Sequence, residues 1–144
     1  MNNFYAEPDE ALKHAYDIGI TAMTIFGTEL EKRKLKDYKE YVGQYGIEIY
    51  GIVQGTALSD PDASVRSSEI NNVKKVIDEA AVHDVKNIMV APSIKSSGEV
   101  SQVRCLKNKM FICDTIVEGL SEIAEYAKGT GVTITLENFS SPKL

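Results

Sequence analysis

One acidic residue stands where a parallel β-strand is predicted to end, and it is the first candidate for chemistry. Residues 132–136 are rich in β-branched side chains and lead directly into Glu137. A carboxylate at the carboxyl end of a parallel strand points into the face where α/β proteins bind ligands. Flanked by Leu136 and Phe139, it needs a metal ion, a substrate hydroxyl or a cationic partner. Glu137 is therefore a candidate metal ligand or general base, and an exposed strand-end carboxylate is the alternative.

Two polar residues hold the same position after earlier predicted strands. Gln54 follows the strand that includes Ile52 and Val53, and Ser93 follows the strand Asn87–Ala91. Amide and hydroxyl groups can hydrogen-bond to the hydroxyl groups of a ligand, so both are candidates for ligand binding. Polar residues are common at strand ends, so a structural role is the alternative.

The remaining chemically active side chains suit ordinary structural roles better. His14 and His83 fall on predicted helices, away from strand ends, and Cys105 and Cys113 are expected to be reduced thiols. A basic group near the third loop could meet a phosphate, but a solvated surface explains it more simply; it comprises Lys95, Arg104, Lys107 and Lys109.

The segments that position these residues alternate between strands and helices. Four β-prone runs predict strands at residues 21–26, 47–53, 87–91 and 132–136. Helical periodicity precedes each of them, over residues 8–18, 28–45, 70–80 and 112–127, and the capping-box pattern at residues 28–31 is expected to start the second helix. Residues 92–104 show no clear period and predict a long loop. With no hairpin signals, this order predicts an α/β fold with a parallel sheet.

Three segments of the sequence resemble a known family. The run GVTITLEN at residues 131–138 resembles the fifth strand of the xylose isomerase-like TIM barrels, a superfamily of sugar and sugar-phosphate isomerases and epimerases. ALKHAYDIGI at residues 11–20 and YGIEIYGI at residues 45–52 resemble the segments of the second and third units. The resemblance implies one domain over residues 1–144, a partial (β/α)8 barrel with about four of its strands.

The resemblance also implies a role for Glu137. In this family the Leu-Glu-Asn motif supplies a glutamate that binds a divalent metal (Mn, Mg or Zn) beside the reacting carbon of the sugar, which implies Glu137 as ligand and catalytic group and Asn138 as a substrate contact. The other ligands of the family lie in an Asp-x-x-His motif and a later glutamate, which do not occur before Leu144. We therefore expect a sugar or sugar-phosphate isomerase or epimerase that works through an enediolate. This chain alone is expected to be inactive. It contains one of the metal ligands of the family, Glu137, and is expected to bind a divalent metal through it or to bind no metal. The alternative is a small non-catalytic α/β domain that binds a ligand or partner.

Composition narrows the class of partner. The net charge of −5 provides no basic field for nucleic acid or an anionic membrane surface, so a small-molecule sugar or sugar phosphate is favoured. The related apurinic-site nucleases use histidines near early strand ends, where this chain has Phe26-Gly27 and Val53-Gln54. No run approaches the roughly 20 apolar residues that span a bilayer, so a soluble, cytoplasmic protein without membrane partners is expected.

Four strands also predict self-association, because about eight are needed to close a barrel. The first and last strands are expected to be the open edges of the sheet. Ile25, Ile49, Val90 and Ile134 are expected to line its uncovered inner face. A homodimer that buries these surfaces is the predicted assembly.

Overall fold

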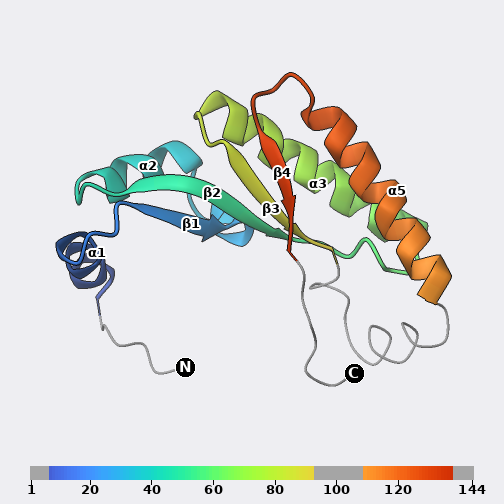
Figure 1. Ribbon diagram of the computed structural model, residues 1–144, viewed down its shortest axis with the longest axis horizontal. Coiled ribbons are helices and arrows are strands. Elements are labelled where there is room, and N and C mark those ends of the chain that lie inside the picture. The colour runs from blue at the N-terminus through green and yellow to red at the C-terminus, as the bar shows by residue number, and fades with distance from the viewer. Residues whose placement is uncertain (1–6, 93–108, 138–144) are drawn as a thin grey trace.

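The computed structural model describes residues 7–92 and 109–137, in which helices and strands alternate (Figure 1). The elements are α1 (Pro8–Asp17), β1 (Ala22–Phe26), the 3-10 helix η1 (Gly27–Glu31), α2 (Leu35–Gly43), β2 (Glu48–Gly55), α3 (Ala63–Val82), β3 (Asn87–Ala91), α5 (Lys109–Ala127) and β4 (Thr133–Leu136). The four strands form one parallel sheet in the order β1-β2-β3-β4. The predicted α/β fold is confirmed, and β1 and β4 are the edge strands, as expected.

The local structure after β1 differs from the sequence prediction. The capping box at Thr28 does not start a regular helix, because residues 27–31 form η1 and α2 begins only at Leu35. The Glu29 carboxylate accepts hydrogen bonds from Lys32 Nζ and Tyr38 Oη, each at 2.9 Å, and these side chains hold it within the η1–α2 corner. By contrast, α3 has a capped start, where Asp62 Oδ1 accepts from the backbone N–H of Ser64 at 2.8 Å.

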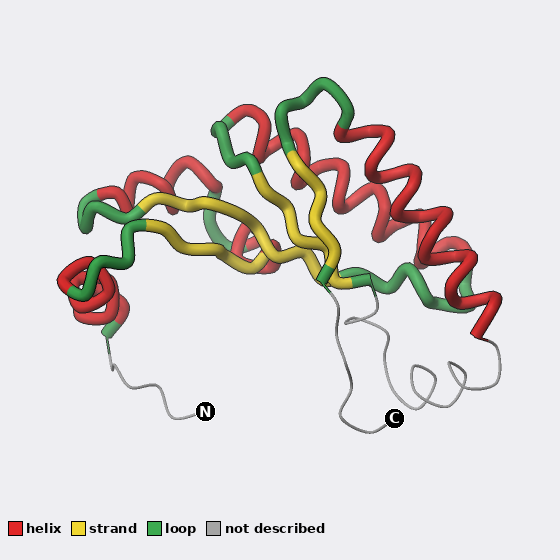
Figure 2. The backbone as a smooth tube through the Cα atoms, in the orientation of Figure 1, coloured by secondary structure: helices red, strands yellow, loops and turns green. Residues whose placement is uncertain are grey.

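One face of the sheet carries the hydrophobic core. Ile52, Ile88 and Val90 are fully buried there, against Val73 and Ile77 of α3, Ile123 of α5 and other buried apolar side chains. The helices α3 and α5 lie side by side (Figure 2), where Lys74 Nζ and Glu122 Oε1 form an ion pair at 2.7 Å. Burial of the isoleucine and valine face is therefore what holds helices and strands together.

The opposite face of the sheet has no helix over it in the described part of the chain. Strand pairing places two rows of residues on it: Thr24, Gly51, Asn87 and Thr133, then Phe26, Val53, Met89 and Thr135. The expectation that Ile25, Ile49, Val90 and Ile134 line this face is wrong, because Ile25 and Ile49 are 6% and 4% exposed and Val90 is fully buried beneath the helices. These four side chains lie on the helix-covered face, and their neighbours along each strand point to the opposite face.

The first helix is attached more loosely than the others. No residue of α1 is buried, although Leu12 and Ala15 pack partly against the core. The hydroxyl of Tyr41 on α2 donates a hydrogen bond to the Asp9 carboxylate of this helix. No helix of the described residues is long and apolar enough to cross a membrane.

Truncation of the core isoleucine Ile52 should be strongly destabilising. We expect Ile52→Ala to lower the free energy of unfolding by about 2–5 kcal/mol, because it leaves a cavity under the helices. Val82→Ala is the control, since Val82 is 77% exposed, and should change it by about 0.5 kcal/mol at most. Urea denaturation measures both, and equal effects would contradict the assigned core face.

The attachment of α1 predicts an unusual tyrosine titration. The hydrogen bond to Asp9 raises the pKa of Tyr41 from 10.0 to about 12. Because this pKa is higher in the folded state, the hydrogen bond stabilises the fold below pH 10 and is lost as the pH rises through about 12. In Asp9→Ala, NMR titration of the labelled Tyr41 ring should show the pKa returning toward 10, while Tyr126, whose pKa is raised by its hydrogen bond to Asp78, should not change. An unchanged Tyr41 pKa would contradict the contact.

Candidate functional site

The carboxyl ends of three strands are tied together side by side. The backbone N–H and the hydroxyl of Thr56, which follows β2, both donate to the carbonyl oxygen of Ala91 on β3, at 2.9 and 3.2 Å. The backbone N–H of Glu137, which follows β4, donates to the carbonyl oxygen of Val90 at 2.9 Å. This last bond continues the β3–β4 ladder by one residue, so Glu137 is held at the rim of the sheet.

The Glu137 side chain belongs to the uncovered face. Side chains alternate along a strand, so Thr133, Thr135 and Glu137 share a face opposite to that of Ile134. Thr135 Oγ1 donates to Asn87 Oδ1 of β3 at 3.1 Å, so the neighbouring polar residues also lie on this side. Glu137 is half-buried, and its carboxylate has no hydrogen bond or ion pair with any residue in the described ranges. A half-buried carboxylate without a partner is suited to bind a cation or exchange a proton.

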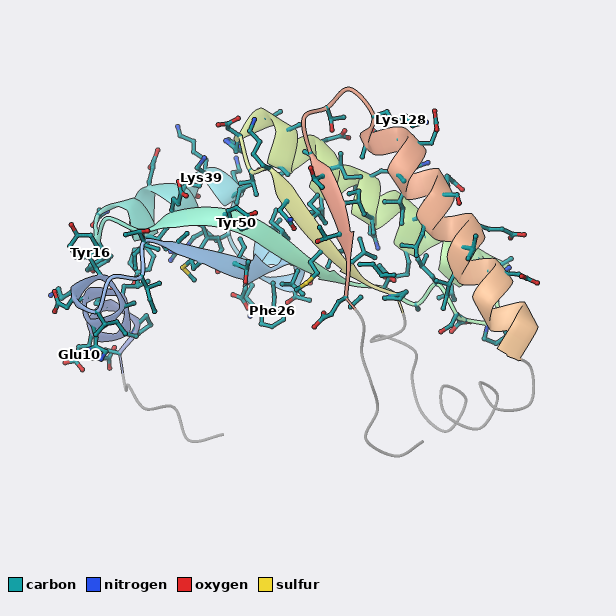
Figure 3. All side chains as sticks on the ribbon, viewed as in Figure 1. Glu10, Tyr16, Phe26, Lys39, Tyr50 and Lys128 are labelled. Atoms are coloured by element: carbon teal, nitrogen blue, oxygen red, sulfur yellow. The ribbon has the colours of Figure 1, made fainter. Side chains whose placement is uncertain are left out.

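An aromatic side chain lies on the same face at the far edge of the sheet. Phe26, at the end of β1, is 64% exposed, and Tyr50, the extra residue at the irregular β1–β2 pairing, is 56% exposed (Figure 3). The uncovered face therefore combines apolar surface with a polar rim. Sequence reasoning missed Phe26, Asn87 and Thr135 as residues of this face. Counting back in steps of two from Glu137 would have found Thr135.

Gln54 is not brought to Glu137. Its side chain lies on the helix-covered side, 5% exposed, where Nε2 donates to the carbonyl oxygen of Gly55 at 3.2 Å. Its Oε1 is buried and has no partner among the described residues. Gln54 lines a groove of about 400 Å³ between the η1–α2 segment and α3, with Lys34 and Lys75 on its walls. A polar residue at a strand end thus faces the helices here, because the strand alternation turns it away from the rim site.

Other sequence candidates lie apart from this site or beyond the described residues. His14 lies on α1. His83 follows α3, and its Nε2 lies 3.4 Å from Glu79 Oε1. Residues outside the description are Ser93, Asn138, Lys95, Arg104, Cys105 and Lys107, together with the side chains of Lys109 and Cys113. Residues 7–92 and 109–137 contain no group of three or more His, Cys, Asp or Glu that could hold a metal ion. The described residues thus supply one carboxylate and not a complete ion site.

Sequence comparison assigns the family. The profile of the xylose isomerase-like TIM barrel family matches residues 12–143, which is most of the chain. The chain belongs to this family, and its four-stranded sheet is part of a TIM barrel. No curated protein sequence matches the chain.

Solved structures support the same fold. D-Psicose 3-epimerase from Clostridium cellulolyticum H10, crystallised with D-tagatose, is 19% identical with a TM-score of 0.67, over 92% of this chain and 47% of that one. A sugar phosphate isomerase/epimerase from Parabacteroides distasonis is 18% identical with a TM-score of 0.63, over 95% and 51%. The IolI protein, crystallised with zinc, is 19% identical with a TM-score of 0.64, over 91% and 46%. The chain therefore spans about half the length of these similar barrels.

The close approach of Gly27 to Gln54 predicts a coupled pair of substitutions. A Cβ atom at Gly27 would lie 1.8 Å from Gln54 Oε1, so Gly27→Ala must displace the buried carboxamide. We expect it to cost about 1–3 kcal/mol in the wild-type background and clearly less in Gln54→Ala. Gly43→Ala is the matched control, because no atom beyond its chain neighbours and the backbone of its own helix lies within 4 Å of the Cβ position. Additive effects in a denaturant double-mutant cycle would contradict this placement of Gln54.

Proposed function

We propose that this chain contributes part of the active site of a metal-assisted sugar or sugar-phosphate isomerase or epimerase. The observation that carries this proposal is Glu137, a half-buried carboxylate without a partner in the described residues, at the carboxyl end of β4 on the uncovered face. This end of a parallel barrel is where TIM-barrel enzymes place their chemistry. It is also the position to which the family resemblance assigns a metal-binding glutamate.

The structural neighbours support the substrate class. One is an epimerase crystallised with D-tagatose, another is called a sugar phosphate isomerase/epimerase, and a third carries zinc. We infer that the substrate is a small sugar or sugar phosphate. Ser93 and Asn138 remain the proposed substrate contacts, whereas Gln54 would have to leave the helix-covered side to take part. The predicted single domain and cytoplasmic location remain predictions.

The chain's own chemical contribution is a carboxylate in a partly desolvated position. A divalent ion, Mn²⁺, Mg²⁺ or Zn²⁺, would polarise the sugar carbonyl in the complete site. The described residues do not hold such an ion by themselves, because they provide no three-ligand group. Glu137 can serve as one oxygen ligand, or take a proton from the carbon beside the carbonyl on the way to an enediolate. We therefore expect the isolated chain to lack isomerase activity.

Paramagnetic broadening by Mn²⁺ tests the role of Glu137, since it detects weak binding without activity. Substoichiometric Mn²⁺ should broaden the amide signals of Gly55, Ala91 and Glu137 at the rim before others. Glu137→Gln should remove this selectivity. Glu48→Gln is the matched control, because Glu48 is an exposed glutamate at the opposite end of the sheet, and should leave the pattern unchanged.

Two results would contradict the proposal. One is broadening spread evenly over the exposed carboxylates, and the other is rim broadening that persists in Glu137→Gln. Either outcome would favour the alternative of a non-catalytic α/β domain.

A further inference from the structure

The carboxyl end of β3 is held by hydrogen bonds from both sides. On one side, the backbone N–H groups of Thr56 and Leu58, in the loop after β2, donate to the carbonyl oxygens of Ala91 and Pro92, each at 2.9 Å. On the other side lies the hydrogen bond from Glu137 to the preceding carbonyl group of β3. The loop after β2 and the end of β4 are therefore joined through the carbonyl groups of three consecutive residues.

The Leu58 side chain extends from this loop into the layer of helices. It is fully buried, and the loop runs beside α5 on its way to the start of α3 (Figure 2). A Cβ atom at Gly119 of α5 would lie 3.0 Å and 3.4 Å from the two Cδ atoms of Leu58, and 3.6 Å from Cδ1 of Ile70 on α3. The missing side chain at Gly119 thus leaves room for Leu58, and we call this contact the loop socket.

Glycine at position 119 weakens the helix in which it lies. Gly119 is in the middle of α5, where glycine is less favourable than alanine because it loses more conformational freedom on folding. Its φ is negative, so the backbone conformation does not require glycine there. The close approach of Leu58 is the contact for which the missing side chain leaves room.

The loop after β2 is also braced by its own hydrogen bonds. The Asp60 carboxylate accepts from the backbone N–H of Asp62 at 2.8 Å, and the backbone N–H of Asp60 donates to the carbonyl oxygen of Ala57 at 3.0 Å. Arg66 Nη1 on α3 donates to the carbonyl oxygens of Asp60 and Pro61 at 2.7 and 3.1 Å. A side chain pushed out of the loop socket should therefore displace the loop as a unit, together with its hydrogen bonds to β3.

We propose that Leu58 and Gly119 are positioning residues for the carboxyl rim, which set the place of the loop after β2 and, through β3, that of Glu137. Leu58 enters the helix layer and Gly119 lies on α5, so both act on the rim from the helix-covered side. The consequence for catalysis rests on the proposed function of Glu137. The geometry of the rim does not depend on that function and can be tested by itself.

Hydrogen exchange in Gly119→Ala tests the positioning without any ligand. The added methyl group should push Leu58 outward, so the amides of Thr56, Leu58 and Glu137 should exchange at least about fivefold faster. The amide of Ile77, in the buried part of α3, should keep its wild-type rate, because alanine favours the helix and global stability is retained. A general weakening of the fold would instead accelerate exchange at Ile77 as well.

A compensating substitution isolates the effect of Leu58. Leu58→Val removes one methylene group, which is the volume that Gly119→Ala adds, so the double variant restores the volume of the core. It should return the exchange of the three rim amides to within about twofold of the wild-type rates. Gly43→Ala is the matched control, because it adds the same methyl group at the end of α2, and should leave these amides unchanged.

Binding of Mn²⁺ tests the consequence for the site. In Gly119→Ala, the Mn²⁺ concentration that broadens the rim amides should rise at least about threefold, and the double variant should recover the wild-type response. If the wild type shows no selective broadening, the proposed function fails, and the exchange rates alone decide the positioning.

Four results would overturn the positioning role. They are unchanged exchange at the three rim amides in Gly119→Ala, equal acceleration at Ile77, no recovery in the double variant, and a selective Mn²⁺ response of the wild type that persists unaltered in Gly119→Ala.

Discussion

A parallel sheet has to be covered on both faces, and in this chain the described helices cover one. Ile25 of β1, Ile52 of β2, and Ile88 and Val90 of β3 lie on the covered face, in one core with buried side chains of α3 and α5. This packing determines which face of the sheet the helices cover. In the described part of the chain, no helix covers the opposite face, and β1 and β4 each pair with one neighbouring strand.

The alternation of strand side chains divides the molecule into a stabilising side and a chemical side. In β4, Ile134 lies beside the core, while Thr135 and Glu137 lie on the other face. In β3, Val90 is fully buried under the helices while Asn87 bonds to Thr135 across the open face. Core substitutions are therefore expected to change stability, whereas substitutions at Glu137 should change chemistry with little effect on the fold. This separation is how TIM barrels combine a rigid scaffold with a variable rim.

Much of the fold could be predicted because strands and helices have different hydrophobic periods. The prediction at residues 87–91 matches β3, and that at residues 21–26 exceeds β1 by one residue. The phase within each strand was harder, because Ile25 and Ile49 are equally plausible on either face until the position of the helices is known. Glu137 could have fixed the phase of β4, because side chains alternate along a strand. If Glu137 lies on the ligand-binding face, Ile134 must lie on the helix-covered face.

Two predictions near β1 and β2, the helix start at Thr28 and the rim position of Gln54, are wrong at places where residues distant in the sequence are in contact. The capping-box pattern at Thr28 is local, but residues 27–31 form the 3-10 helix η1, in which the Glu29 carboxylate accepts a hydrogen bond from Tyr38 of α2. Gln54 looked like a rim residue because it ends a strand run, yet its carboxamide packs against Gly27 on the helix side. Neither contact has a signature in a single sequence.

We propose that the uncovered face with its carboxyl rim, and not the groove on the helix side, binds the ligand. The most direct measurement is an amide chemical-shift titration with a ketohexose such as D-fructose in the presence of Mg²⁺. We expect shifts at Val53, Met89, Thr135 and Glu137 on the open face. Shifts confined to the groove around Lys34, Gln54 and Lys75 would contradict it.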